Sequence, residues 1–248
     1  MPETVKIEPD SQLPGVIARA IGIITSPRAT YEKVVRKPKV IGILALVALI
    51  MGGSQAAFML TPQGQGAWLD KQAEQSEKTN KIFGIQPTAE QTAQQEQVMK
   101  KMAPYVGYGA LLGMFVFLPI FMLIMSGIYW AIFNAALGGT ASFRQVMSVL
   151  AHSAVISSLG AVFGMIMAFA LGTITNFPAN VGLLLPFLNE GGFAANLVGV
   201  VDLFIVWSVI VTAIGFGVLY RRSSRNIAIT LLCIGGLFAV IFASLASR

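Results

Sequence analysis

One acidic residue, Asp202, lies inside an apolar run of the sequence, LVGVVDLFIVW. A carboxylate in such a run could bind a cation or relay a proton, or it could accept hydrogen bonds that hold neighbouring helices together. Its partners must lie at a matching depth in the neighbouring apolar runs. The uncharged residues that meet this condition are Ser54, Gln55, Tyr105, Tyr108, Thr173, Thr175 and Ser244. We take Asp202 with Tyr108, Ser54, Gln55 and Thr173 as the candidate polar site, with both roles left open.

Other site chemistries find little support in the sequence. The single histidine, His152, is a poor metal site by itself, and the single cysteine, Cys233, excludes a disulfide framework. The sequence contains no P-loop, HExxH or GxSxG motif. We therefore expect no catalytic residues, no metal and no cofactor, and we predict that the chain is not an enzyme.

The composition indicates a membrane protein rather than a soluble domain. Of the 248 residues, 55% are hydrophobic and 11% are charged, whereas soluble domains carry about 25% charged residues. The net charge of +6 comes from basic residues beside apolar runs, which favours anionic headgroups over nucleic acid as the partner. The first ten residues, MPETVKIEPD, are polar and acidic. They do not resemble a cleavable signal peptide, so we expect the first apolar run to direct insertion.

Five apolar stretches are each long enough to cross a bilayer as a helix, which needs about 20 residues. Because backbone groups in hydrocarbon must be satisfied within the segment, and the runs do not alternate as barrel strands do, we predict an all-α bundle. The expected spans are residues 40–60, 107–133, 151–174, 197–219 and 227–245, which together make residues 40–248 a membrane domain.

The distribution of Lys and Arg predicts the orientation. The side that holds the N-terminal segment carries eleven of these residues, and the other side carries six. The positive-inside rule then places the N-terminus in the cytoplasm and the C-terminus outside, in a membrane that we expect to be the bacterial cytoplasmic membrane.

Residues 1–39 precede the first span and are predicted to form two short amphipathic helices. Apolar residues recur at helical spacing from Leu13 to Ile24, and Ser26 and Pro27 suit the cap and first position of a second helix. We expect these helices to lie on the cytoplasmic membrane surface, with packing beneath the bundle as the alternative. The basic residues expected to meet anionic headgroups are Arg28, Lys33, Arg36, Lys37 and Lys39.

Two loops are expected on the outer side. Residues 61–104 are rich in Gln, Glu and Lys, and the Thr88–Gln91 spacing predicts a capping box that opens the second of two polar helices. This insertion is either a solvated hairpin or a surface that docks a partner. The later loop, residues 176–196, contains an apolar segment, Val181 to Phe187, that is too short to span and could dip into the interface.

Small residues predict close helix packing. Ser157 lies on one helical face with the GxxxG pair Gly160 and Gly164, and Gly52 ends a similar small-residue face on the first span. Pro119 should kink the second span. These features suit a tightly packed bundle or a transporter with bending helices.

Three segments resemble the Yip membrane-protein family, which is named for interaction with Ypt/Rab GTPases, and in particular its bacterial members. They are SPRATYEKVVRKP (26–38), GGTASFRQVMSVLAHS (138–153) and DLFIVWSVIVTAIGF (202–216). The resemblance implies a five-span bundle with a cytosolic N-terminus and no catalytic residues. Eukaryotic relatives act in vesicle traffic and membrane shaping through GTPases and homologous partners, whereas this chain has a short cytosolic segment and a long polar outer loop.

Two functions follow as hypotheses. The first is a non-catalytic membrane scaffold that binds another membrane protein or a second copy of itself, which the small-residue faces and basic helices favour. The second is a small-solute or ion transporter or channel component that uses Asp202.

Overall fold

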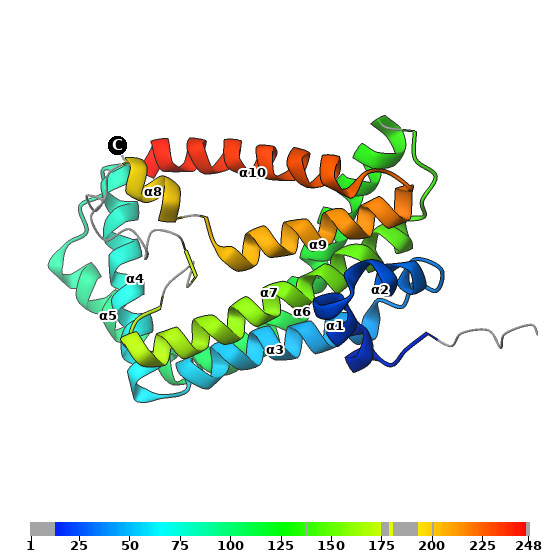
Figure 1. Ribbon diagram of the computed structural model, residues 1–248. Coiled ribbons are helices and arrows are strands. Elements are labelled where there is room, and N and C mark those ends of the chain that lie inside the picture. Colours follow the sequence, from blue (N-terminus) through cyan, green and yellow to red (C-terminus); the bar gives the residue numbers. More distant parts are fainter. Residues whose placement is uncertain (1–12, 137, 175–178, 181–192, 200, 247–248) are drawn as a thin grey trace, which may run out of the picture.

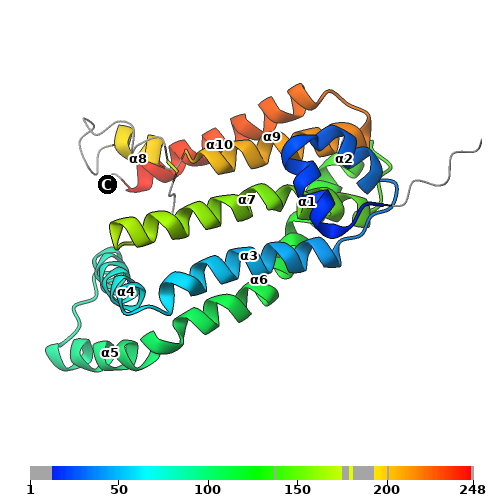
Figure 2. The same cartoon turned by 60° about the horizontal axis from the view of Figure 1, so that its bottom comes forward.

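The computed structural model describes residues 13–136, 138–174, 179–180, 193–199 and 201–246. Four long helices lie side by side along the molecule: α3 (Ile41–Met59), α6 (Val106–Trp130), α7 (Phe143–Leu171) and α9 (Leu203–Tyr220). A fifth, α10 (Ser224–Ala246), packs on α9 (Figures 1 and 2). The all-α architecture predicted from the sequence is confirmed. The apolar loop segment 181–187 and Thr175 fall outside the described residues.

Four helices in the described part of the chain are long and apolar enough to cross a membrane: α3, α7, α9 and a continuous helical run from Ala89 to Ala135 that contains α6. These four correspond to the first four expected spans. Helix α10 has 23 residues, and its crossing stays a prediction.

Helix boundaries differ from the predicted spans where a side chain caps the helix. Helix α7 begins at Phe143 instead of residue 151, because Ser142 and Gln145 form a capping box that opens the helix in the polar loop. Helix α9 begins at Leu203 instead of residue 197, because Asp202 is its N-cap. The residues just before it form a separate short helix, α8 (Phe193–Gly199).

The polar residues after α3 form α4 (Pro62–Phe83) and α5 (Ala89–Met102). Gly84, with φ of 64°, ends α4, and the Thr88–Gln91 capping box opens α5. Exposed pairs such as Glu74–Lys78 and Glu96–Lys100, each 2.6 Å apart, line these helices and lower the pKa of both glutamates through the lysine hydrogen bonds. Helix α5 continues through a single turn, η1 (Ala103–Tyr105), directly into α6, which passes through Pro119 and ends in the π-helical η2 (Ala131–Ala136).

The two N-terminal helices, α1 (Val16–Thr25) and α2 (Pro27–Val34), pack across the opposite end of the bundle from α4 and α5 (Figure 1). Ile23, Tyr31 and Val34 are fully buried in the core. Ile17 and Ile21 are 69% and 55% exposed, so the apolar residues of α1 divide between the bundle and the outside. Pro27 occupies the first turn of α2 as expected, but the Ser26 side chain makes no capping hydrogen bond.

Close contact between α3 and α6 depends on Gly52. A Cβ atom at this position would lie 3.1 Å from the Leu111 Cα and carbonyl oxygen of α6, whereas a Cβ at the adjacent Gly53 would meet nothing within 4 Å. Small residues of this kind let the backbones of membrane helices approach each other.

We predict that Gly52→Leu destabilises the bundle by about 1–3 kcal/mol, because the α6 backbone has to move. Gly53→Leu, one residue away in the same helix, should be neutral or slightly stabilising, since leucine favours helix over glycine. The thermal unfolding midpoint in detergent, followed by circular dichroism, measures both. Equal midpoints for the two variants would contradict this packing role.

Candidate functional site

Asp202 stands at the N-terminus of α9 with its carboxylate bound to the backbone. Its Oδ1 accepts hydrogen bonds from the Phe204 and Ile205 amides at 2.8 and 3.3 Å, and its Oδ2 accepts one from the Ala179 amide at 2.9 Å. The residue is 4% exposed. We expected it a turn or two inside the fourth span, but it precedes the helix by one residue. An acid at this position satisfies amides that have no partner within the helix and complements the helix dipole.

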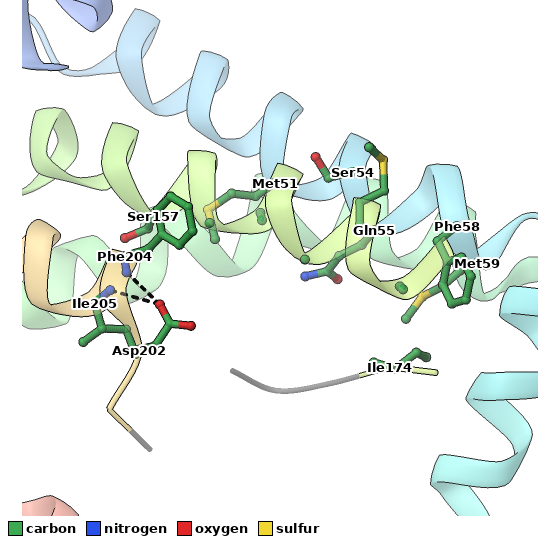
Figure 3. A pocket seen from close by; sticks show the side chains of 15 residues that line it. Met51, Ser54, Gln55, Phe58, Met59, Ser157, Ile174, Asp202, Phe204 and Ile205 are labelled. Atoms are coloured by element: carbon green, nitrogen blue, oxygen red, sulfur yellow. Dashed lines mark hydrogen bonds between the residues drawn. The ribbon is translucent and has the colours of Figure 1, made fainter. Parts of the chain in front are cut away.

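Asp202 lines a cavity of about 400 Å³ between α3, α7 and the start of α9 (Figure 3). Two of the polar partners expected from depth, Ser54 and Gln55, line the same cavity. So do Ser157, Gly160 and Gly164, which were predicted as packing residues. The remaining lining is mostly apolar: Met51, Phe58, Met59, Ala161, Met165, Ala168, Ile174, Phe204 and Ile205.

The other expected partners lie elsewhere. Tyr108 is exposed on α6, and Thr173 is exposed beyond the end of α7; neither lines the cavity. Tyr105 is also exposed, and Ser244 donates to the Val240 carbonyl of its own helix, α10. Matching depth in the sequence is therefore compatible with Ser54 and Gln55 lying beside Asp202, but it does not determine which face of α6 Tyr108 occupies.

The polar groups of this cavity have few free hydrogen-bonding positions. Ser54 donates to the Ile50 carbonyl of its own helix at 2.6 Å, and Ser157 donates to Ser208 at 3.4 Å. The Gln55 amide points into the cavity (Figure 3). No group of three His, Cys, Asp or Glu residues that could hold a metal occurs among the described positions. The cavity is therefore suited to holding an apolar group beside one amide, and its carboxylate serves as a helix cap.

Packing between α7 and α9 is tight at Gly160. A Cβ atom there would lie 3.0 Å from the Phe204 Cβ, and the Phe163 and Phe204 rings are in tilted contact with centroids 5.7 Å apart. The Phe204 amide donates to the Asp202 cap, so the cap and the glycine together determine how α9 meets α7.

A second polar cluster, which the sequence did not predict, joins the N-terminal helices to α7. Arg19 Nη1 lies 3.0 Å from His152 Nε2 and donates to the Lys39 carbonyl at 3.1 Å. His152 Nδ1 lies 2.7 Å from the Ser148 carbonyl. Because a carbonyl only accepts, Nδ1 carries the hydrogen and Nε2 accepts from Arg19, which makes this a neutral imidazole. Arg19 is 3% exposed, and burial lowers the pKa of its guanidinium.

Tyr31 of α2 extends this cluster. Its hydroxyl lies 2.7 Å from Ser153 Oγ, and Ser153 in turn donates to the Val149 carbonyl. Burial raises the pKa of Tyr31, which keeps the phenol protonated. The sequence offered one signal for this cluster: Arg19 interrupts the apolar run VIARAIGII four residues before the fully buried Ile23, and so shares its helical face.

Comparison with known proteins identifies the family of this chain. Residues 21–245 match the model of the Yip1 domain. The chain belongs to the Yip1 domain family. It is also similar to membrane protein YknW of Bacillus subtilis (strain 168), with 26% identity over 196 residues that cover 78% of this chain and 75% of that protein. No solved structure shows a significant match. The family resemblance seen in the sequence is confirmed, and the chain is an integral membrane protein with a bacterial homologue.

Within this Yip1-domain chain, we predict that Asp202→Ala lowers the stability of the fold by about 1–2 kcal/mol, because α9 loses its cap. Asp202→Asn should cost less, since asparagine caps a helix about as well as aspartate. Thermal unfolding midpoints in detergent report both values. Equal losses in the two variants would contradict the capping role.

Proposed function

We propose that this Yip1-domain protein is a non-catalytic scaffold that binds a second membrane helix, from another protein or from a second copy of itself. The observation that supports this most directly is an open glycine pair on α6. A Cβ atom at Gly109 or at Gly113 would meet nothing within 4 Å. Gly52 and Gly160, by contrast, each face a neighbouring helix at 3.0–3.1 Å.

The open glycine pair has the features of a helix-binding surface. Gly109 and Gly113 form a GxxxG pair, which lets two membrane helices approach closely. Helix α6 packs on α3 and α7 along one side, and large apolar residues continue the exposed side toward its C-terminal half. Among them Val116, Ile120 and Ile124 are all exposed. We call Gly109, Gly113, Val116, Ile120 and Ile124 the α6 face.

The proposed topology has five crossings, with α10 as the fifth. Its 23 residues amount to about 34 Å of helix, which is enough for a hydrocarbon core of about 30 Å. Basic residues favour a cytoplasmic N-terminus and an external C-terminus. In this arrangement residues 1–39 form a cytosolic segment, residues 40–248 form the membrane domain with α4 and α5 outside it, and the membrane is the bacterial cytoplasmic one.

A non-catalytic role agrees with the family, whose members are membrane proteins not generally known as enzymes. The buried polar groups near α7 also have structural partners. Arg19 of α1 contacts His152 of α7 and the Lys39 carbonyl, and Tyr31 of α2 contacts Ser153 of α7. We propose that they hold α1 and α2 on the bundle, where Arg28, Lys33, Arg36, Lys37 and Lys39 meet anionic headgroups.

A transporter or channel role for Asp202 is the second candidate, because this carboxylate lines the 400 Å³ cavity. It is less supported, since both oxygens already accept backbone hydrogen bonds.

We predict that Gly113→Leu reduces association of the purified protein, either with itself or with a co-purifying membrane protein, by at least roughly tenfold, because the bulky side chain separates the helices. Gly236→Leu is the matched control, since Gly236 is also open but lies on α10. Both changes favour helix formation, so loss of fold is not expected. Light scattering after gel filtration in mild detergent measures the complex. A wild-type protein that is consistently a lone monomer would refute the proposal.

The transporter candidate is tested by Asp202→Asn in reconstituted vesicles. If Asp202 only caps α9, ion and proton flux across the vesicles should equal that of the wild type. A large loss of flux in this variant, with the thermal midpoint retained, would favour the transporter role instead.

A further inference from the structure

A second large cavity lies at the opposite end of the bundle from α4 and α5, where α2, the start of α7 and the end of α9 meet. Its volume is about 630 Å³. Four of its lining residues are arginines. Arg28 lies in α2 and Arg36 follows it, and Arg221 and Arg222 follow α9. The remaining lining residues are Glu32, Val35, Gln145, Gly217, Val218 and Leu219. We call this the arginine cavity.

Backbone geometry holds the arginines at this end. Arg221 has a left-handed conformation, with φ of 53°, and ends α9. The Arg222 amide then donates to the Gly217 carbonyl at 3.1 Å. Helix α2 is held against α7 because Gln145 Nε2 donates to the Val35 carbonyl at 3.0 Å. Two segments almost 200 residues apart in the sequence therefore bring their arginines to one cavity. Figure 1 shows α2 and the end of α9 at the same end of the bundle.

The charge of the lining is strongly positive. Glu32 is the one acid among the lining residues, against four arginines. It lies 3.7 Å from Arg28 Nε in a pair whose side chains are both exposed, and such pairs contribute little. A neighbouring cavity of about 470 Å³ shares Gln145, Arg221 and Arg222 and adds Thr140, which supplies a hydroxyl donor. Guanidinium groups bind phosphate through paired hydrogen bonds, so this lining suits a phosphate-bearing anion.

The position of the cavity favours a lipid headgroup over a soluble phosphate as its ligand. It lies where the apolar helix α9 ends, at Tyr220, and the exposed Ile17 and Ile21 of α1 lie at the same end of the bundle. The ends of membrane-crossing helices lie at the level of the lipid headgroups, and basic cavities between helices at the cytoplasmic side bind anionic lipids. A phospholipid can therefore place its phosphate in the cavity while its chains stay in the bilayer.

We propose that the arginine cavity is a discrete binding site for the headgroup of an anionic phospholipid, which it binds through the phosphate. This is narrower than general attraction of the basic N-terminal helices to the membrane, because it assigns the site to Arg36, Arg221 and the other residues that line the cavity, and it leaves out Arg144 and Arg225. It depends on the membrane location of the chain and is independent of whether the α6 face binds a partner.

The test is native mass spectrometry of the full-length, delipidated protein titrated with phosphatidylglycerol or phosphatidylcholine. The wild type should retain one phosphatidylglycerol in preference to phosphatidylcholine. Arg36→Gln with Arg221→Gln should weaken phosphatidylglycerol binding by roughly 10- to 30-fold, from the loss of two cations near the headgroup. The matched control, Arg144→Gln with Arg225→Gln, removes the same charge from exposed arginines outside the cavity and should change binding less than about twofold.

A second variant keeps the proposal falsifiable if the glutamine substitutions unfold the protein. Arg36→Lys with Arg221→Lys retains the charge but loses the paired donors, so it should bind phosphatidylglycerol more weakly than the wild type. Wild-type affinity in this variant, or equal losses in the cavity and control glutamine variants, would overturn the proposal in favour of diffuse attraction. Displacement of the lipid by an equal concentration of inorganic phosphate or pyrophosphate would show a soluble anion site and overturn the lipid assignment.

Discussion

Satisfaction of backbone hydrogen bonds at helix ends determines much of this structure. A helix leaves four amides and four carbonyls without partners, and in hydrocarbon there is no water to bind them. Side chains supply the partners at four helix starts: Thr61 for α4, Thr88 for α5, Ser142 for α7 and Asp202 for α9. Left-handed residues supply the stops, with Gly172 after α7 and Arg221 after α9. Each of these residues determines where its helix begins or ends.

The features that depend only on local composition, such as the apolar helices, could be predicted from the sequence. Apolar length predicted the helices, and local capping patterns predicted the start of α5. Sequence reasoning failed at Asp202, because this cap lies inside an apolar run and so resembles a residue of a longer span. One of its backbone partners is Ala179, 23 residues away, which no local pattern indicates. Matching depth brought Ser54 and Gln55 to the same cavity as Asp202 but not Tyr108 or Thr173, because depth does not determine the rotation of a helix about its axis.

The Arg19–His152 contact marks a further limit of sequence reasoning. The two residues are 133 positions apart, and each alone is typical of an interfacial residue. Their pairing results from how α1 crosses the end of α7, which depends on the packing of Ile23, Tyr31 and Val34. Amphipathic helices predicted to lie on the membrane surface therefore also belong to the core, and the outer face of α1 keeps Ile17 and Ile21 for other contacts.

The continuous helix from Ala89 to Ala135 has a mechanical consequence. Its 47 residues correspond to about 70 Å, more than twice the thickness of a hydrocarbon core. Helix α5 is therefore the helical extension of a segment that is long and apolar enough to cross the membrane, and not a loop. A 3₁₀ turn at Ala103–Tyr105, Pro119 and the π-helical η2 interrupt this run, so a tilt imposed on α5 meets three places where the helix can bend before the connection into α7.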